Sequence, residues 1–600
     1  MRLWLAVCVV LTGCALTPDR VSPVKFVVGV SHANLTEPWR ITMNTEIGEQ
    51  AAASPELRLV VTDAADSVAR QIQDVDRLLA SGIDLLIISP VDGDALTPAV
   101  TRAYQKIPVI LLDRAVQGYN YTLFLGPDNR RIGQMMGAYV ASSLGARGGS
   151  VVEVQGRSGS PPVLDRSLGF RESLAGTNVR IENVVVADWL RDEAQDALER
   201  TFAAHPRVDF VVAQNDAMAL GAYRAATDRG LIGTRFVGID GLPGPDGGVD
   251  LVDRGVLDAT FHCPTGGREA VEYALDILHH APGIPKKIFL RPRIITQGQT
   301  EPAPRTIRGR PIVLGYAQTG RESQWREANT VSIKAAAGAA GVQLLFRDAD
   351  QKQENQIAAL REFIARRVDV IALPPLVETG WDAVLAEAKA AGIPVIFSDR
   401  TAQVRDPSLV TTVLGGDFAE EGRRAARWLV DRAGSQEVSV VEIGGTAGST
   451  PAIERAQGFR EVLASHPNYR ILGSADGDFR KEGGRVVMTE FLRKWGRSIQ
   501  AVFAHNDDMA LGAVDAIEAA GLKPGKDILL VSIDGVRAAF RAMIEGKLNC
   551  SVECSPLLGP QLMKAVQDYA QGKELPLRIV TEEGVYPQEI AGRSMAGRPY

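Results

Sequence analysis

The chain has 600 residues, of which 45% are hydrophobic and 23% charged, and its formal net charge is −6. Disordered chains carry fewer apolar residues and more net charge, so this composition excludes a mostly disordered protein. The acidic balance argues against nucleic acid as a main partner, because nucleic-acid-binding surfaces are strongly basic. No apolar run reaches the roughly 18 residues of a membrane-spanning helix, which excludes a polytopic membrane protein.

The first 13 residues are typical of a bacterial export signal. Arg2 supplies a positive charge, and residues 3–12 form an apolar stretch that is too short to span a bilayer. The stretch ends in Gly13-Cys14, and small residues before a cysteine resemble the lipobox of bacterial lipoproteins. This resemblance implies a signal over residues 1–13, lipidation of Cys14 and a lipidated tether over residues 14–23. A buried start of the first strand is the alternative.

Cysteine usage does not require disulfides. Outside the signal the chain has Cys263, Cys550 and Cys554, which are too few for a disulfide framework in a chain of this length. Cys550 and Cys554 are four residues apart in an expected strand, where their side chains lie too far apart to bridge. We therefore expect buried free thiols.

The chain repeats itself once, at an offset that drifts from 286 to 294 residues. The matched segments are Trp39-Arg40 with Trp325-Arg326, Asp113-Arg114 with Asp399-Arg400, Arg166 with Arg455, Asn215-Asp216 with Asn506-Asp507, and Ile239-Asp240 with Ile533-Asp534. A period near 290 residues is a duplicated domain pair rather than a solenoid unit. Residues 301–310 are rich in Pro and Arg, as exposed linkers are. The expected modules are therefore residues 24–300 and 311–600.

Each copy alternates short apolar runs with amphipathic, helix-period segments. In the first copy the expected strands are Lys25–Val30, Leu57–Thr62, Asp84–Ser89, Val109–Leu112, Tyr121–Leu125, Ser150–Val154, Phe210–Ala213 and Phe236–Ile239, with helices such as Val68–Ala80 and Ile132–Leu144. Continuous apolar strands between such helices predict parallel sheets that are covered on both faces. The predicted fold class is α/β, with two lobes per copy and four in total.

Polar residues follow these strands where ligands bind in open α/β sheets. Asp113, Asn215 and Asp240 each come at the carboxyl end of an expected strand. Asp399, Asn506 and Asp534 hold the same places in the second copy. Two lobes that face each other through these strand ends form a cleft, so we expect one cleft in each copy.

The residue types around each expected cleft suit a sugar. Carboxylates and Asn accept hydrogen bonds from hydroxyls, Arg donates in a fork, and a Trp face covers the C–H face of a sugar ring. Taken singly, each Asp-Arg could instead be an ion pair at a strand end, and each Trp could be a core residue. Repetition of the whole set in both copies favours binding.

Both copies resemble the periplasmic sugar-binding proteins of the ribose-binding type that serve ABC importers, and the second copy is similar to their galactofuranose-binding members. The segments that carry the resemblance are Gly320–Arg326, Gln351–Ile357, Ala504–Met509, Gly521–Ile528 and Ser532–Val536. Arg321, Gln324 and Leu557 depart from the galactofuranose pattern. The resemblance implies the type I fold of this family, in which two Rossmann-like lobes are joined by a hinge and close on ligand.

The resemblance also implies the binding residues. In the second copy Trp325 would stack on the sugar, with Arg326, Asp399, Arg400, Arg455, Asn506 and Asp534 on its hydroxyls and Glu322 as a further contact. In the first copy the matching residues are Trp39, Arg40, Asp113, Arg114, Arg166, Asn215 and Asp240, with Asn34 added from the stretch before Trp39. The matched set predicts a second competent pocket; a degenerate copy kept for structure is the alternative.

Enzyme, metal and cofactor motifs are missing from the sequence. It has no His-Glu-x-x-His, no Cys-x-x-Cys and no phosphate-binding GxxxxGK[ST] loop. His279 and His280 are adjacent and cannot share one helix face, so they do not predict a metal site. We expect no enzyme, no metal and no cofactor.

Three functional hypotheses are considered for this sequence. The expected one is a lipid-anchored, periplasmic or cell-surface solute-binding protein that captures a monosaccharide by hinge closure and delivers it to an ABC transporter permease. The alternative is an extracytoplasmic sugar sensor that presents its closed form to a chemoreceptor or histidine kinase. A transcriptional regulator is opposed by the export signal and by the short segment before the first strand, which has no room for a helix-turn-helix.

Overall fold

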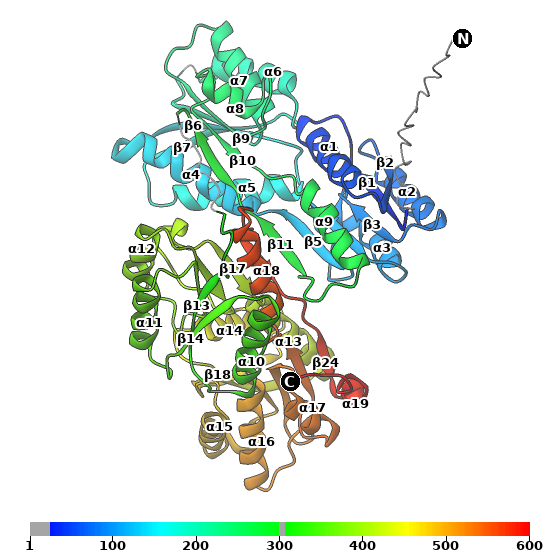
Figure 1. The fold of residues 1–600 in the computed structure, drawn as a ribbon, viewed down its shortest axis with the longest axis vertical. Helices are drawn as coiled ribbons and strands as arrows, with labels where there is room; N and C mark the ends of the chain where they lie inside the picture. The colour runs from blue at the N-terminus through cyan, green and yellow to red at the C-terminus, as the bar shows by residue number, and fades with distance from the viewer. Residues whose placement is uncertain (1–23, 206, 299–305) are drawn as a thin grey trace, which may run out of the picture.

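Each half of the chain folds into a module of two lobes, which confirms the predicted tandem α/β architecture (Figure 1). The computed structural model describes residues 24–205, 207–298 and 306–600. The expected export signal with Cys14 and the whole tether therefore lie outside the described residues, as do residues 301–305 of the expected linker.

In the first module, a parallel sheet forms the core of each lobe. The first lobe contains β1 (Phe26–His32), α1 (Pro38–Ala52), β2 (Leu57–Asp63), α2 (Val68–Ala80), β3 (Leu85–Ile88), α3 (Gly93–Tyr104), β4 (Val109–Leu112), β5 (Leu123–Pro127), α9 (Gly267–Leu278) and β11 (Lys287–Leu290). The second lobe contains α4 (Asn129–Leu144), β6 (Gly149–Gln155), α5 (Pro161–Leu174), β7 (Val179–Val186), α6 (Arg191–Ala204), β8 (Phe210–Ala213), α7 (Asp216–Asp228), β9 (Arg235–Asp240), α8 (Gly248–Asp253), β10 (Ala259–His262) and β12 (Arg293–Thr296).

The second module repeats this order. Its first lobe contains β13 (Val313–Gln318), α10 (Gln324–Ala339), β14 (Gln343–Asp348), α11 (Gln353–Ala365), β15 (Val370–Leu373), α12 (Asp382–Ala390), β16 (Val395–Ser398), β17 (Thr412–Gly415), α18 (Gly559–Ala570) and β23 (Arg578–Val580). Its second lobe contains α13 (Phe418–Ala433), β18 (Val438–Gly444), α14 (Thr450–Leu463), β19 (Tyr469–Asp476), α15 (Lys481–Trp495), β20 (Ala501–Ala504), α16 (Asp507–Ala519), β21 (Leu529–Asp534), α17 (Arg537–Ile544), β22 (Cys550–Glu553), β24 (Val585–Pro587) and α19 (Ala591–Ser594).

Three crossovers connect the lobes of each module. In the second module they follow β17, β22 and β23, so the chain passes between the lobes near residues 416, 555 and 582. In the first module they follow β5, β10 and β11. These crossovers form the hinge of each module, and the carboxyl ends of the parallel strands of both lobes face the cleft that the hinge spans.

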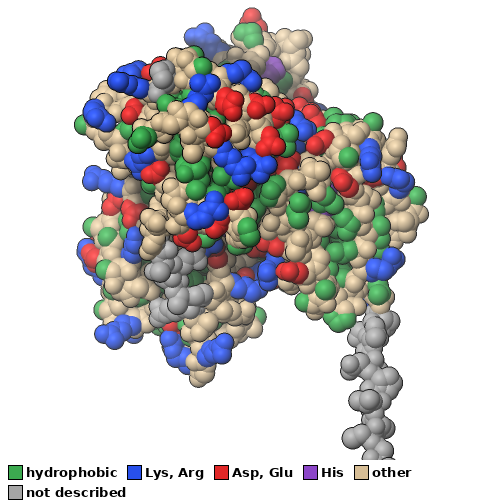
Figure 2. Space-filling view, turned by 90° about the horizontal axis from the view of Figure 1, so that it is seen from above, with side chains coloured by type: hydrophobic (Ala, Val, Ile, Leu, Met, Phe, Trp, Pro, Cys, Tyr) green, Lys and Arg blue, Asp and Glu red, His purple; other side chains and the backbone are tan. Residues whose placement is uncertain are grey.

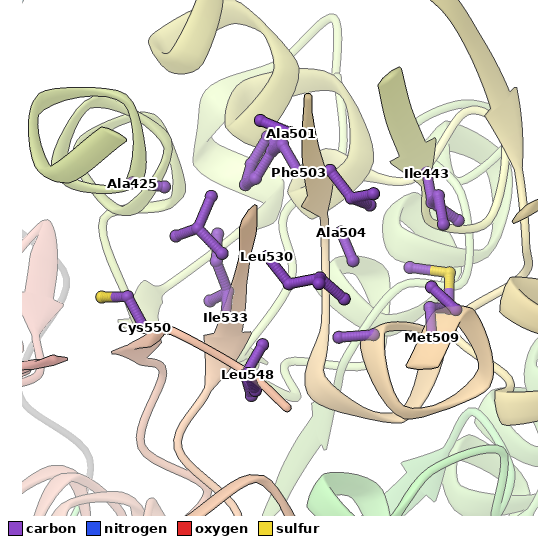
Figure 3. Packing of buried hydrophobic residues seen from close by; sticks show 14 of the residues in the cluster. Ala425, Ile443, Ala501, Phe503, Ala504, Met509, Leu530, Ile533, Leu548 and Cys550 are labelled. Atoms are coloured by element: carbon purple, nitrogen blue, oxygen red, sulfur yellow. The ribbon is translucent and has the colours of Figure 1, made fainter. Parts of the chain in front are cut away.

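Apolar strands between amphipathic helices give each lobe its core. In the second lobe of the second module, Phe503 and Ala504 of β20 and Leu530 and Ile533 of β21 pack between helix residues such as Met509 (Figure 3). The expected strands at Val109–Leu112 and Phe210–Ala213 form with the predicted bounds. Strand β7 was not predicted, because alternate residues along it face solvent and the sequence lacks a continuous apolar run there.

The first lobes of the two modules share one sheet of twelve strands, in the order β14-β13-β15-β16-β17-β23-β11-β5-β4-β3-β1-β2. Strands β11 and β23 run antiparallel, with Ile288 opposite Ile579. These isoleucines hold equivalent places, because Ile288 pairs with Leu125 on β5 and Ile579 pairs with Leu414 on β17. Equivalent residues thus face each other, as they do across the twofold axis of a symmetric dimer.

Side chains reinforce this joint. The Arg291 guanidinium donates to the main-chain oxygens of Thr411 and Leu575. Arg424 lies 4.2 Å from the ring centroid of Tyr119 and donates to the main-chain oxygen of Glu583 at 2.7 Å. The joint therefore ties the first module to the hinge region of the second.

The surface carries both signs of charge. Figure 2 shows Lys and Arg side chains interspersed with Asp and Glu over the face that it presents, without a large field of one sign. Among the described residues, none of the helices combines the length and hydrophobicity needed to cross a membrane. Cys263, Cys550 and Cys554 are buried and free, as predicted.

Candidate functional site

A cavity of about 290 Å³ lies between the lobes of the second module. Its lining includes the complete set of residues that the sequence predicted for this module: Glu322, Trp325, Arg326, Asp399, Arg400, Arg455, Asn506 and Asp534. Ser323, Pro451, Phe479 and Cys554 complete it.

Four charged side chains form the wall on the first lobe. Arg326 donates to Asp399 at 2.8 Å and to Glu322 at 3.1 Å, and Arg400 lies 3.6 Å from Glu322. Burial opposes ionisation of Glu322, but the charges of Arg326 and Arg400 outweigh it and lower the pKa of this carboxyl. Burial and the charge of Arg326 lower the pKa of Arg400 to about 10, so Arg400 stays charged at neutral pH.

Arg455 on α14 forms the wall on the second lobe. Its Nε donates to Glu421 at 2.7 Å, and its Nη1 donates to the main-chain oxygen of His505 at 2.7 Å. Its Nη2 lies 3.8 Å from Asp534 at the end of β21. Burial raises the pKa of Asp534 well above its ordinary value, although the charge of Arg455 opposes this shift. Arg455 therefore presents one end to the cavity while its other atoms are fixed.

The remaining polar groups lie at the carboxyl ends of strands, which orient them toward the cavity. Asn506 caps α16 by accepting from the Met509 amide at 2.9 Å, and its Nδ2 donates to the main-chain oxygen of Phe479 at 3.1 Å. Asp399 and Asp534 have positive φ angles of 76° and 126°, conformations that are uncommon for residues other than glycine and are found at functional sites. The ends of β16 and β21 are thus built to turn carboxylates toward the cleft.

The first module has an equivalent cavity of about 430 Å³. Seven predicted residues line it: Trp39, Arg40, Asp113, Arg114, Arg166, Asn215 and Asp240. Asn34 does not. Its side chain is buried behind the wall, where its Nδ2 donates to Glu37 at 2.8 Å and to Asp66 at 3.0 Å. Asn34 was assigned from its neighbourhood to Trp39 rather than from a match to the second copy, and Glu37 takes its place in the lining.

The arginines of the first cavity keep their positions, and only some of their hydrogen-bond partners differ. Arg40 donates to Asp113 at 3.2 Å and to Ser89 at 2.9 Å, and Arg114 donates to the main-chain oxygen of Val91 at 2.9 Å. Arg166 donates to the Asn129 carboxamide at 2.8 Å, whereas Arg455 pairs with a carboxylate.

Sequence reasoning missed two aromatic residues. Trp189 and Phe479 line their cavities, and both have positive φ angles, 72° and 58°. The Arg166 guanidinium lies 5.6 Å from the Trp189 ring and Arg400 lies 5.3 Å from that of Phe479. The repeat could have identified this pair, because Ala187-Asp188-Trp189 and Gly477-Asp478-Phe479 match at an offset of 290, within the observed drift.

Hydrogen-bonding capacity remains unused in both cavities. Within the part of the chain that the structure describes, Glu322 Oε2, Arg326 Nη1 and Arg400 Nε are buried without a hydrogen-bond partner. In the first cavity the same holds for Arg40 Nε and Arg114 Nε. Because an unsatisfied buried polar atom costs about 1–3 kcal/mol, these atoms point to a polar ligand rather than an apolar one.

Contacts across each cleft hold the lobes together. In the second module the main-chain amide and the side chain of Gln324 donate to Asp508 at 3.0 and 3.1 Å. In the first module Arg157 lies 3.2 Å from Asp66. Both contacts join a residue of the first lobe to one of the second, so both clefts are closed in this structure.

A family model described as a periplasmic binding protein domain matches the chain twice, over residues 28–281 and 314–574. The galactofuranose-binding protein YtfQ of Escherichia coli K12 is 43% identical over 284 residues, which are 47% of this chain and 89% of that protein. The fructose import binding protein FruE of Bifidobacterium longum is 31% identical over 287 residues, 47% of this chain and 86% of that protein. A crystal structure of a galactofuranose-binding protein shares 42% identity with a TM-score of 0.47, and the match covers 48% of this chain and 97% of that structure.

Proposed function

The chain belongs to the periplasmic binding protein family, whose domain it carries twice, and on that premise we propose that it is an extracytoplasmic receptor for monosaccharides. Each module closes on one sugar, and the loaded receptor delivers it to an ABC transporter permease. Domain limits of 24–300 and 311–600, joined by the linker 301–310, belong to this proposal, as does a lipid anchor at Cys14.

The observation that carries the proposal is the set of unpartnered atoms in the two clefts. Glu322 Oε2 can accept a hydrogen bond, while Arg326 Nη1 and Arg400 Nε can donate. A sugar hydroxyl both donates and accepts, so a ring with several hydroxyls can satisfy all three. Charge-assisted bonds of this kind are roughly twice as strong as neutral ones, which compensates for the lost hydration of the sugar.

Aromatic side chains supply the rest of the pocket. The Trp325 indole donates to the main-chain oxygen of Cys554 at 2.6 Å, which fixes the ring at the cavity wall. Trp39 makes the equivalent bond to Cys263 at 2.7 Å. A fixed aromatic face covers the C–H side of a sugar at little entropic cost. The relatives named for galactofuranose and fructose support a small sugar as ligand.

Calorimetry of the full chain against pentoses and hexoses, with furanose-forming sugars included, tests the proposal. We expect two binding sites, one weakened roughly 30-fold in Asp113→Ala and the other weakened by the same factor in Asp399→Ala. The proposal would be refuted if the chain bound no sugar of the panel. It would also be refuted if the variant with both substitutions bound sugar as the unchanged chain does.

Transport and anchoring need separate measurements. A strain that lacks the gene should lose uptake of the radiolabelled sugar; normal uptake with a lost chemotactic or transcriptional response would favour a sensor instead. Cys14→Ser should release the protein from the membrane fraction and abolish labelling with a radioactive fatty acid. Retention of both the label and the membrane association would overturn the anchor at Cys14.

A further inference from the structure

Three potential metal ligands meet at the hinge of the second module. Glu421 lies in the first turn of α13 after the first crossover, Cys554 follows β22 in the second crossover, and Glu583 lies in the third crossover between β23 and β24. One ligand atom from each of these residues lies within 4.8 Å of the others. The cluster is thus formed by segments far apart in sequence, which is why a search for metal-binding motifs does not find it.

The carboxylate of Glu421 is buried with one oxygen unused. Its Oε2 accepts from Arg455 Nε at 2.7 Å, but its Oε1 has no hydrogen-bond partner among the described residues. A Cβ atom added at Gly416 would lie 2.6 Å from Oε1 of Glu421 and 2.6 Å from Oε1 of Glu583. Glycine at this position therefore leaves space where the two carboxylates converge.

The charges of the cluster are not balanced by the protein. Arg455 compensates one of the two carboxylates, while the nearby Arg424 is engaged by the Glu420 side chain and by the main-chain oxygen of Glu583. Either a bound proton or a bound cation must therefore neutralise the second carboxylate.

We propose that Glu421, Cys554 and Glu583 bind one zinc-like divalent cation. Zinc accepts thiolate sulfur and carboxylate oxygen together, and three protein ligands leave a fourth position for water. Two carboxylates and a thiolate carry three negative charges, which a divalent cation and Arg455 balance. Glu583 is only half-buried, so the cation has a route in from solvent.

The bound cation would act on the sugar pocket through Glu421. This carboxylate would use Oε1 for the metal and Oε2 for Arg455, which lines the cavity. A group that is hydrogen-bonded to a metal ligand orients that ligand, so Arg455 and the cation would be coupled through Glu421. A cation held by all three crossovers would also restrict the hinge, so we expect it to favour one arrangement of the two lobes.

The first module supplies a natural comparison. Strand and helix equivalences place Ile132, Cys263 and Pro292 where the second module has Glu421, Cys554 and Glu583. Only the cysteine is shared, and Cys263 accepts from Arg166 at 3.4 Å. The first module folds without either carboxylate, so the fold itself does not require them.

Cobalt(II) substitution of the full chain tests the site. Co²⁺ replaces zinc and shows a near-ultraviolet charge-transfer band when a thiolate is its ligand. We expect this band in the unchanged chain and in the matched control Cys263→Ser, and its loss in Cys554→Ser. Elemental analysis should find one zinc per chain in the first two proteins and none in Cys554→Ser. Lack of the band in the unchanged chain, or a band that persists in Cys554→Ser, would refute the site.

A second variant protects the test against misfolding. Glu583→Gln keeps the size of the side chain and removes its charge, and circular dichroism shows whether it folds. Zinc should raise the melting temperature of the unchanged chain and of Cys263→Ser, but not that of folded Glu583→Gln. An equal rise in Glu583→Gln would mean that zinc binds at another site, and no rise in any of these proteins would mean that the cluster holds no zinc.

Discussion

The two modules place the same arginines around their clefts but support the innermost one in different ways. Arg166 of the first module is held by a neutral carboxamide, that of Asn129, whereas Arg455 of the second is held by the Glu421 carboxylate. Glu421 occupies the position of Ile132 in the first module. Groups that face a cleft can thus stay matched while the charges behind them change. Substitutions that exchange residues between the modules can therefore test each role separately.

The largest effect is expected from Glu421→Ile, which introduces the first module's residue into the second. It leaves the buried Arg455 without its ionic partner, and breaking a buried ion pair in this way costs about 3–5 kcal/mol. We expect the free energy of unfolding of the second module to fall by this amount. Urea unfolding of the full chain, with hydrogen exchange of peptides assigned to each module, measures it in the presence of a metal chelator.

Asn129→Ala is the matched change in the first module. It removes one hydrogen bond to a charged group, which contributes about 1.5–3 kcal/mol. The exchange rates of peptides from the first module should therefore rise less than those of the second module do in Glu421→Ile. Equal losses of stability would contradict the distinction between the two supports.

The next effect concerns pH. Each module buries a histidine at a position where the other module has glutamine: His32 is equivalent to Gln318, and His505 is equivalent to Gln214. Burial and the charge of Arg40 lower the pKa of His32 from 6.5 to about 4. The folded first module holds this ring neutral, while the unfolded chain protonates it near pH 6.5. Its stabilising contribution is therefore complete above pH 6.5 and is lost as the pH falls toward 4, by about 3 kcal/mol.

His32→Gln tests this by placing the second module's residue in the first. The decrease in the free energy of unfolding between pH 7 and pH 4 should be smaller by about 3 kcal/mol than in the unchanged chain. His505→Gln should spare the first module and reduce the acid sensitivity of the second, since burial also lowers the pKa of His505. An unchanged pH profile of the first module in His32→Gln would show that its imidazole protonates freely.

Asp399→Ala should weaken sugar binding at the second site by about 2 kcal/mol, or roughly 30-fold. Arg326 and Arg400 both lie against this carboxylate, so its loss leaves Glu322 as the one carboxylate that the two buried guanidinium groups share. Calorimetry of the full chain measures the affinity, and the first site should be unaffected. Asp113→Ala is the reciprocal change, and loss of both sites in either single variant would show that the clefts are not independent.

The repeat explains how much of the site could be predicted. Residues directly after a parallel strand, such as Asp113 and Asp399, were located because a strand end fixes where its next side chain lies. Trp189 and Phe479 were missed because they follow strands with alternating burial, which give a weak signal in sequence. Asn34 was misplaced because its loop differs between the copies, and Glu37 reaches the cavity instead.

The joint between the modules could not be predicted from local patterns. Strand β23 has three residues and β11 has four, so neither gives a periodic signal. Their pairing depends on tertiary placement, because each is the edge strand of its own lobe until the two modules meet. The duplication predicted two similar modules, and only their packing decides that equivalent edges join.

The smallest effect is expected from the contact that closes the second cleft. The equivalent of Asp508 in the first module is Ala217. Asp508→Ala therefore introduces the first module's residue and removes the two hydrogen bonds that Gln324 donates across the cleft. Their loss raises the free energy of the closed form relative to the open form, so sugar affinity should fall by about 1 kcal/mol, roughly fivefold. Calorimetry measures this change, and small-angle scattering without sugar should show a more open second module.

Ala217→Asp in the first module is the control that separates charge from geometry. The partner position there is Pro38, which has no N–H to donate, and its side chain offers no donor either. The new carboxylate should therefore not increase the sugar affinity of the first site. An increase would mean that charge at this position closes a cleft without the bonds from Gln324. Unchanged affinity and scattering in Asp508→Ala would mean that these bonds do not contribute to closure.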